Sequence, residues 1–66
     1  MRIVLRNIKT GLYLGPQNEW TPELMAARCF RHSAEAMDAA RELGLQDLEV
    51  LLSFEQPPQQ VILPLS

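Results

Sequence analysis

The stretch SAEAMDAARELG, residues 33–44, most constrains the fold, because it is the segment with the clearest helical pattern. Ser33 is a favourable N-cap, and Gly44 can end the helix in a left-handed conformation. The apolar positions form one narrow stripe, made of Ala36, Met37, Ala40 and Leu43. A narrow stripe in which two of the four residues are alanine lets a helix approach a sheet closely, and a lone helix can cover only one of the two faces.

Two segments before this helix have the composition of a β-hairpin. Residues 2–8 (RIVLRNI) and 11–15 (GLYLG) are rich in branched and aromatic side chains, which favour strands. Gly11 can adopt the positive φ that the intervening turn needs. Strand alternation then predicts one face with Ile3, Leu5, Leu12 and Leu14, and an opposite face with Val4 and Tyr13.

The following loop, residues 15–24, carries a second and shorter helical signal. Thr21 can cap a helix, Pro22 suits the first helical position, and Glu23 lies where the helix dipole favours an anion. We expect one or two helical turns there. Trp20, in the same loop, is expected to close one end of the core.

Two strand patterns come after the main helix. Residues 48–55 (LEVLLSFE) alternate as the strongest strand in the chain. The prolines of residues 56–60 (QPPQQ) cannot donate to a ladder, so this segment connects to a last strand at residues 61–65 (VILPL), where Pro64 marks an edge or the strand's end. The sequence predicts an α+β fold of order ββαββ, with a mainly antiparallel sheet of three to four strands covered on one face by a single helix.

The composition indicates one globular domain, residues 1–66. The chain is 47% hydrophobic and 21% charged, a balance typical of globular proteins. Its single cysteine excludes an internal disulfide, so we expect a cytoplasmic protein. Arginines interrupt the apolar N-terminal residues, unlike a signal peptide, and no stretch approaches the roughly 18 apolar residues of a membrane span.

The only cysteine and the only histidine lie three positions apart, as Cys29 and His32. Zinc needs about four ligands, and this pair supplies half of them. A nucleophilic pair needs a third group to orient the imidazole, although Arg28 and Arg31 could activate the thiol; thiol-dependent activity at Cys29 is therefore a third hypothesis. We favour Cys29 as a small, partly buried residue and His32 as a polar residue before the helix.

Other chemical motifs are also missing from the sequence. It contains no glycine-rich phosphate loop. The carboxylates of the main helix, which are Glu35, Asp38 and Glu42, fall on its expected solvent face. We therefore predict no catalytic residue, no metal site and no cofactor, and a protein that is not an enzyme.

The side of the sheet away from the helix suggests the main functional hypothesis. It is expected to expose four apolar or aromatic residues ringed by both signs of charge, namely Val4, Tyr13, Leu51 and Ile62. An apolar centre with a charged rim is the anatomy of a protein interface. We predict a protein-interaction or accessory domain that forms a homodimer or binds another protein through this face, with the 61–65 edge contributing.

The charges are unevenly distributed along the chain. Residues 1–32 hold five basic and two acidic side chains, whereas residues 33–66 hold one basic and six acidic. One explanation is a weak nucleic-acid-binding surface, which would use Arg2, Arg6, Lys9, Arg28 and Arg31. The explanation we favour is cross-strand pairing of Arg2 and Arg6 with Glu49 and Glu55.

The order TGLYL, then Trp20, then ARCFRHSAEAMDAAREL resembles short bacterial proteins of uncharacterised function. In those proteins a Thr-Gly hairpin precedes a tryptophan and an Ala-x-x-Phe step into a Ser-capped helix. The resemblance covers about residues 10–43. It implies the hairpin-then-helix order, with Ala27 and Phe30 as packing residues, and no activity.

Overall fold

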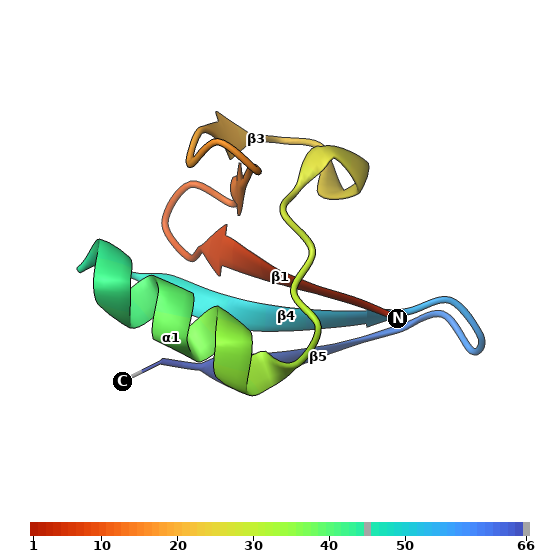
Figure 1. Ribbon diagram of the computed structural model, residues 1–66. Helices are drawn as coiled ribbons and strands as arrows, with labels where there is room; N and C mark the ends of the chain where they lie inside the picture. The colour runs from red at the N-terminus through yellow and green to blue at the C-terminus, as the bar shows by residue number, and fades with distance from the viewer. Residues whose placement is uncertain (45, 66) are drawn as a thin grey trace.

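The protein, described here by a computed structural model over residues 1–44 and 46–65, forms a five-stranded antiparallel sheet with one α-helix against it (Figure 1). The elements in chain order are β1 (Arg2–Asn7), β2 (Tyr13–Leu14), β3 (Trp20–Thr21), the 3₁₀ turn η1 (Leu24–Ala26), α1 (Ser33–Leu43), β4 (Leu48–Phe54) and β5 (Gln59–Pro64). The strand order in the sheet is β3-β2-β1-β4-β5. The predicted α+β class is confirmed, and the sheet has more strands than predicted.

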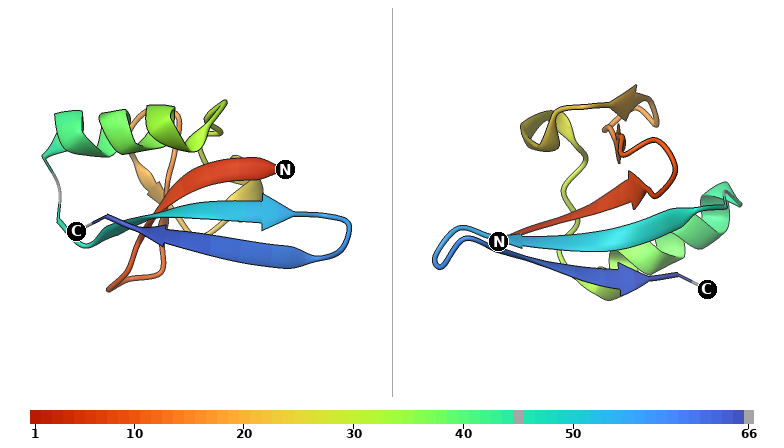
Figure 2. Two further views of the ribbon diagram at one scale, coloured as in Figure 1. Left: turned by 90° about the horizontal axis from the view of Figure 1, so that it is seen from below. Right: turned by 180° about the vertical axis from the view of Figure 1, so that it is seen from behind.

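Helix α1 lies on one side of the sheet, as Figure 2 shows when the molecule is seen from below. Its N-cap is His32, whose backbone is extended and whose carbonyl accepts the Glu35 and Ala36 amides, so Ser33 is the first helical residue rather than the predicted cap. Gly44 ends the helix at φ 63°, as predicted. Ala36 and Ala40, two residues of the predicted apolar stripe, are the buried positions of the helix.

The predicted hairpin is present, but β2 is short and pairs with β1 only at Tyr13. The turn between the strands is held by Asn7, whose side-chain Oδ1 accepts the amides of Lys9 at 2.9 Å and Thr10 at 3.1 Å. Gly11 follows with φ 76°, a conformation that favours glycine. The hairpin is therefore fixed by its turn chemistry more than by its ladder.

The predicted short helix is present as a single 3₁₀ turn, and only its predicted start at Pro22 is wrong. Thr21 is extended because it pairs with Tyr13 as part of β3, and its Oγ1 accepts the Glu23 amide at 3.2 Å. The helical turn starts only at Leu24, as η1. Trp20 lies in β3 at the sheet edge with 37% of its surface exposed, so it does not close the core as we expected.

The main core lies between α1 and the sheet. Its buried members, contributed by β1, β2, β4, α1 and the segment before α1, are Ile3, Leu5, Leu14, Phe30, Ala36, Ala40, Leu48 and Val50. Ile3, Leu5 and Leu14 lie in this core, as the strand alternation predicted. Leu12, which was predicted on the same face, is only partly buried and is not among the buried members.

A second, smaller cluster lies on the side of the sheet away from α1, which we call the back face. It contains Val4 from β1, Leu51 from β4 and Ala27, with Tyr13 and Leu24 packed against it. Leu24 and Ala27 belong to residues 24–30, which we call the covering segment. Both faces of the central sheet are thus covered by the chain itself.

The covering segment is held to the sheet by backbone hydrogen bonds. The Arg28 amide donates to the Leu14 carbonyl and the Phe30 amide to the Ile3 carbonyl, both at 2.8 Å. Figure 1 shows this stretch running from η1 across β1 toward the start of α1. It passes from Ala27 in the back-face cluster to Phe30 in the main core, so one short segment contributes to both.

Candidate protein-interaction site

The predicted interface does not exist as an exposed patch. Val4 and Leu51 both have 0% of their surface exposed, because Leu24 and Ala27 of the covering segment pack against the back face. Tyr13 is partly buried in the same cluster. The prediction was wrong because it gave residues 24–30 no position over the sheet.

Ile62 is the one predicted interface residue that stays open. It lies opposite Leu51 in the β4–β5 ladder, so the two side chains share the back face. Ile62 is nevertheless 45% exposed, whereas Leu51 is fully buried. The cover over the back face therefore shields the centre of the sheet more completely than its β5 edge.

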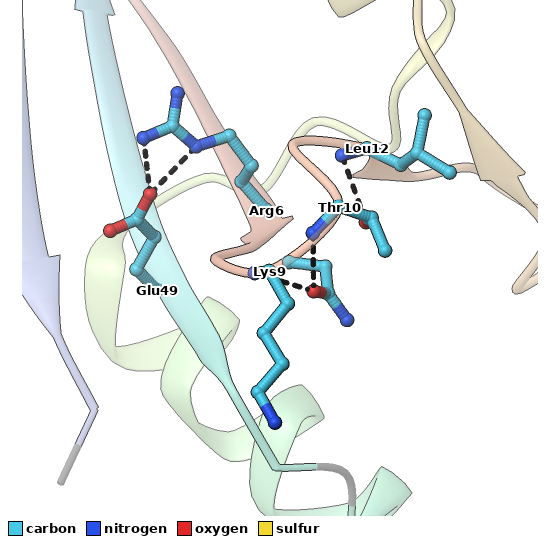
Figure 3. A network of polar contacts seen from close by, with 6 residues as sticks. Arg6, Lys9, Thr10, Leu12 and Glu49 are labelled. Atoms are coloured by element: carbon cyan, nitrogen blue, oxygen red, sulfur yellow. Dashed lines mark hydrogen bonds and ion pairs between the residues drawn. The ribbon is translucent and has the colours of Figure 1, made fainter.

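The predicted cross-strand pairing is confirmed for Arg6 and Glu49, which lie directly opposite each other in β1 and β4. Arg6 Nε is 2.6 Å from Glu49 Oε1, and a second guanidinium nitrogen of Arg6 contacts the same oxygen (Figure 3). The hydrogen bond with Glu49 raises the pKa of Arg6, although burial acts in the opposite direction. Arg2 lies opposite Ser53, so it does not face an acidic side chain in the ladder.

Three of the five basic residues required by the nucleic-acid hypothesis are already engaged. Arg6 pairs with Glu49, Lys9 Nζ lies 3.5 Å from Asp47 Oδ2, and the Arg28 guanidinium lies 4.8 Å from the centre of the Phe30 ring. The first two contacts neutralise basic charge within the fold. Internal pairing between the two halves of the chain therefore involves two of the five basic residues, Arg6 and Lys9.

Cys29 and His32 are both exposed, which corrects the predicted partial burial of the cysteine. The thiol Sγ lies 3.8 Å from the Phe30 carbonyl oxygen, a weak local contact. Within residues 1–44 and 46–65, no group of three or more His, Cys, Asp and Glu side chains is arranged to hold a metal ion. Because it is exposed, Cys29 lies on the outer side of the covering segment.

Strand β5 is the outermost strand next to β4, as the view from behind in Figure 2 shows. Its six residues pair with β4 in one continuous register, from Gln59 opposite Phe54 to Pro64 opposite Glu49. Along its other side, the described part of the chain places no strand. Pro64 had predicted that this strand lies at an edge of the sheet or ends there.

The hydrogen bonds of β1 determine which backbone groups of β5 face outward. Ile3 and Asn7 turn their backbone groups away from β4, since the Ile3 carbonyl accepts from the covering segment and Asn7 bonds within the hairpin. Because these directions alternate along an antiparallel strand, Val4 bonds to Leu51. Leu51 then faces β1, and Ile62 opposite it turns both its N–H and its C=O outward.

The same alternation turns Gln60 and Pro64 outward. Proline has no N–H, and at this position its absence removes no bond to β4, which explains why the strand tolerates Pro64. The edge strand predicted from Pro64 is confirmed. The outer edge therefore presents the N–H groups of Gln60 and Ile62, and the carbonyls of Gln60, Ile62 and Pro64.

The β5 edge carries no charge of its own. Residues 56–65 contain no Asp, Glu, Lys or Arg. Exposed edge strands are usually protected by charged side chains, by prolines or by a covering element, because their free backbone groups pair readily with another chain. Here Pro64 blocks one position only, and the donors of Gln60 and Ile62 stay available.

Comparison of the chain with protein-family models, with curated proteins and with solved structures finds no match. The resemblance of residues 10–43 to short bacterial proteins stays a prediction. Among the described residues, no helix has both the length and the apolar character needed to cross a membrane. The β5 edge is thus the site on which a functional proposal can rest.

Proposed function

We propose that the protein is a small, non-catalytic interaction domain that binds another polypeptide by strand addition at the outer edge of β5. The observation that carries this proposal is the outward direction of the Gln60 and Ile62 backbone groups on an uncharged edge strand. An extended segment can bond to such an edge through its main chain, in the manner of other strand-addition domains. The proposal replaces the buried back-face patch with the edge beside it.

The bound segment would make two kinds of contact. Its backbone would pair with the two donors and three acceptors of β5, each hydrogen bond contributing about 1 kcal/mol. Its side chains on the back-face side would pack beside Ile62, which is 45% exposed. This contact area is small compared with that of permanent complexes, so the proposal is for a weak and reversible association.

We place this function in the cytoplasm. The thiol of Cys29 is exposed, and a reducing compartment keeps such a thiol from forming a disulfide between molecules. The proposed activity requires no cofactor and no chemical step.

Strand addition is tested by titrating isotope-labelled protein with a short, uncharged peptide of alternating threonine and valine. We expect NMR shifts concentrated at the β5 amides, above all Gln60 and Ile62, with the α1 amides unchanged. The matched control is a chemically synthesised chain carrying an N-methyl group on the Ile62 amide, which removes one outward donor and should reduce binding. In a sample that sedimentation shows to be monomeric, unchanged β5 amides at millimolar peptide, or shifts centred on another element, would overturn the proposal.

A further inference from the structure

We propose that the polypeptide bound at the β5 edge is a second copy of this chain. In this arrangement β5 of one molecule runs antiparallel to β5 of the other, about a two-fold axis beside Ile62, and the two sheets become one. The inference rests on the proposed function, since it names the partner for the same edge. It is carried by the charge, the hydrogen-bonding pattern and the side-chain pattern of β5.

The absence of charge on β5 favours pairing with a second copy. Two identical strands that carry a charge near their midpoint bring like charges together, and like charges directly opposite are destabilising. Residues 56–65 contain no charged side chain, so self-pairing of β5 has no such cost. The same segment offers no charge by which to select a foreign partner, which leaves shape and apolar contact as the basis of recognition.

The pattern of outward backbone groups on β5 is also complementary to itself. Outward residues must oppose outward residues, and placing Ile62 opposite the partner's Ile62 satisfies this condition. The two Ile62 residues then exchange two hydrogen bonds, and each Gln60 amide donates to the Pro64 carbonyl across the interface. The missing N–H of Pro64 leaves only the Gln60 carbonyl without a bond to the other strand.

Side-chain pairing selects this register over its neighbour. With Ile62 at the axis, Val61 lies opposite the partner's Leu63, so apolar side chains meet on the helix side of the joined sheet. Moving the strands by two residues would keep the number of hydrogen bonds but would place Gln59 opposite Leu63. Apolar and branched cross-strand pairs stabilise a sheet more than mixed ones, so the Ile62-centred register is favoured.

The arrangement also closes on itself. A two-fold contact uses the same edge on both molecules, so joining two β5 strands leaves neither free for a third copy. The opposite edge of each sheet is β3, which has only Trp20 and Thr21. The expected product is a dimer rather than a fibre.

The dimer is tested by sedimentation equilibrium of the whole chain from low micromolar to millimolar concentration. We expect the mass to rise with concentration toward twice the chain mass. Ile62→Lys places two like charges at the axis and should keep the protein monomeric throughout. Ile8→Lys is the matched control, because Ile8 is 55% exposed and lies outside β5, and it should dimerise like the parent chain.

A monomer at millimolar concentration that still binds the threonine–valine peptide would overturn the second-copy inference and leave strand addition intact. Failure of both experiments would overturn strand addition itself. A dimer that persists in Ile62→Lys would place the contact on another surface and overturn the inference. Far-ultraviolet circular dichroism of each variant verifies that it is folded, and the N-methyl Ile62 chain serves in place of any variant that is not.

The register has its own measurement. In a sample mixed from labelled and unlabelled chains, the Ile62-centred register predicts an intermolecular NOE between the α-protons of Val61 and Leu63, which face each other as a non-hydrogen-bonded pair. An NOE between the α-protons of the two Val61 residues would instead show the shifted register and overturn the Ile62-centred one.

Discussion

Replacing Leu51 with alanine tests whether the covering segment really closes the back face. Leu51 is fully buried against Val4 and Ala27, so the change removes buried apolar atoms and leaves a cavity between β4 and residues 24–30. Leucine-to-alanine changes at such sites cost about 3 to 5 kcal/mol. The whole free energy of unfolding of a chain this short is about 3 to 10 kcal/mol, so the loss should be large.

Ile62→Ala is the control, since Ile62 lies opposite Leu51 on the same face but is 45% exposed. We expect this change to cost about 1 kcal/mol, because only part of the side chain leaves water on folding. Urea unfolding followed by circular dichroism, at low micromolar concentration, gives both free energies. For a domain of this size, about 3 kcal/mol lowers Tm by roughly 12 to 24 °C. Equal costs for the two variants would refute a covered back face.

Three further predictions concern the polar contacts and the turns. Arg6→Met should destabilise the fold by about 2 to 4 kcal/mol in urea unfolding, because it leaves the buried Glu49 carboxylate unpaired. Adding Glu49→Leu should recover most of that loss. A double variant as unstable as the single one would contradict this pairing. The pKa of Arg6 is raised in the folded state, so its contribution to the free energy of unfolding should be constant from neutral to mildly alkaline pH. That contribution should fall only as the pH rises through the raised pKa. A difference between the parent and Arg6→Met that shrinks between pH 6 and 9 would contradict the Arg6–Glu49 pairing. Gly44→Ala should cost about 1 kcal/mol through backbone strain alone, because a Cβ there meets no atom within 4 Å, and Gly44→Asn should cost less, as thermal unfolding would show. Asn7→Ala should cost about 1 kcal/mol by removing the acceptor of two turn amides, while Asn7→Asp, which keeps the acceptor, should unfold near the parent temperature.

Much of the secondary structure could be predicted because it depends on local chemistry. Gly44 ends α1 at a positive φ, a property of the residue itself. The alternation in residues 48–55 assigned Val50 to the helix side and Leu51 to the back face, as the core clusters confirm. The pairing of Arg6 with Glu49 followed from placing opposite charges on two long strands of one sheet.

The predictions that failed concern the middle of the chain, where local signals are weak. Thr21 and Pro22 have the residue types of a helix start, but cross-strand pairing of Thr21 with Tyr13 makes the backbone extended. No spacing in residues 24–30 indicates that Ala27 would lie over one face and Phe30 within the other. That placement depends on hydrogen bonds to β1 and β2, which are brought together only in three dimensions.

The sequence by itself determined the helix and its C-terminal end at Gly44, the long strands β1 and β4, and the edge position of Pro64. Each of these depends on residue conformation and on the spacing of apolar residues within one segment. The tertiary structure alone decided which apolar residues are covered and which stay open. Val4, Leu51 and Ile62 are all apolar and share one face, and only the path of the covering segment separates the first two from the third. Burial is a property of what lies above a residue, and in this protein the cover comes from a segment whose sequence does not show which face of the sheet it will cover.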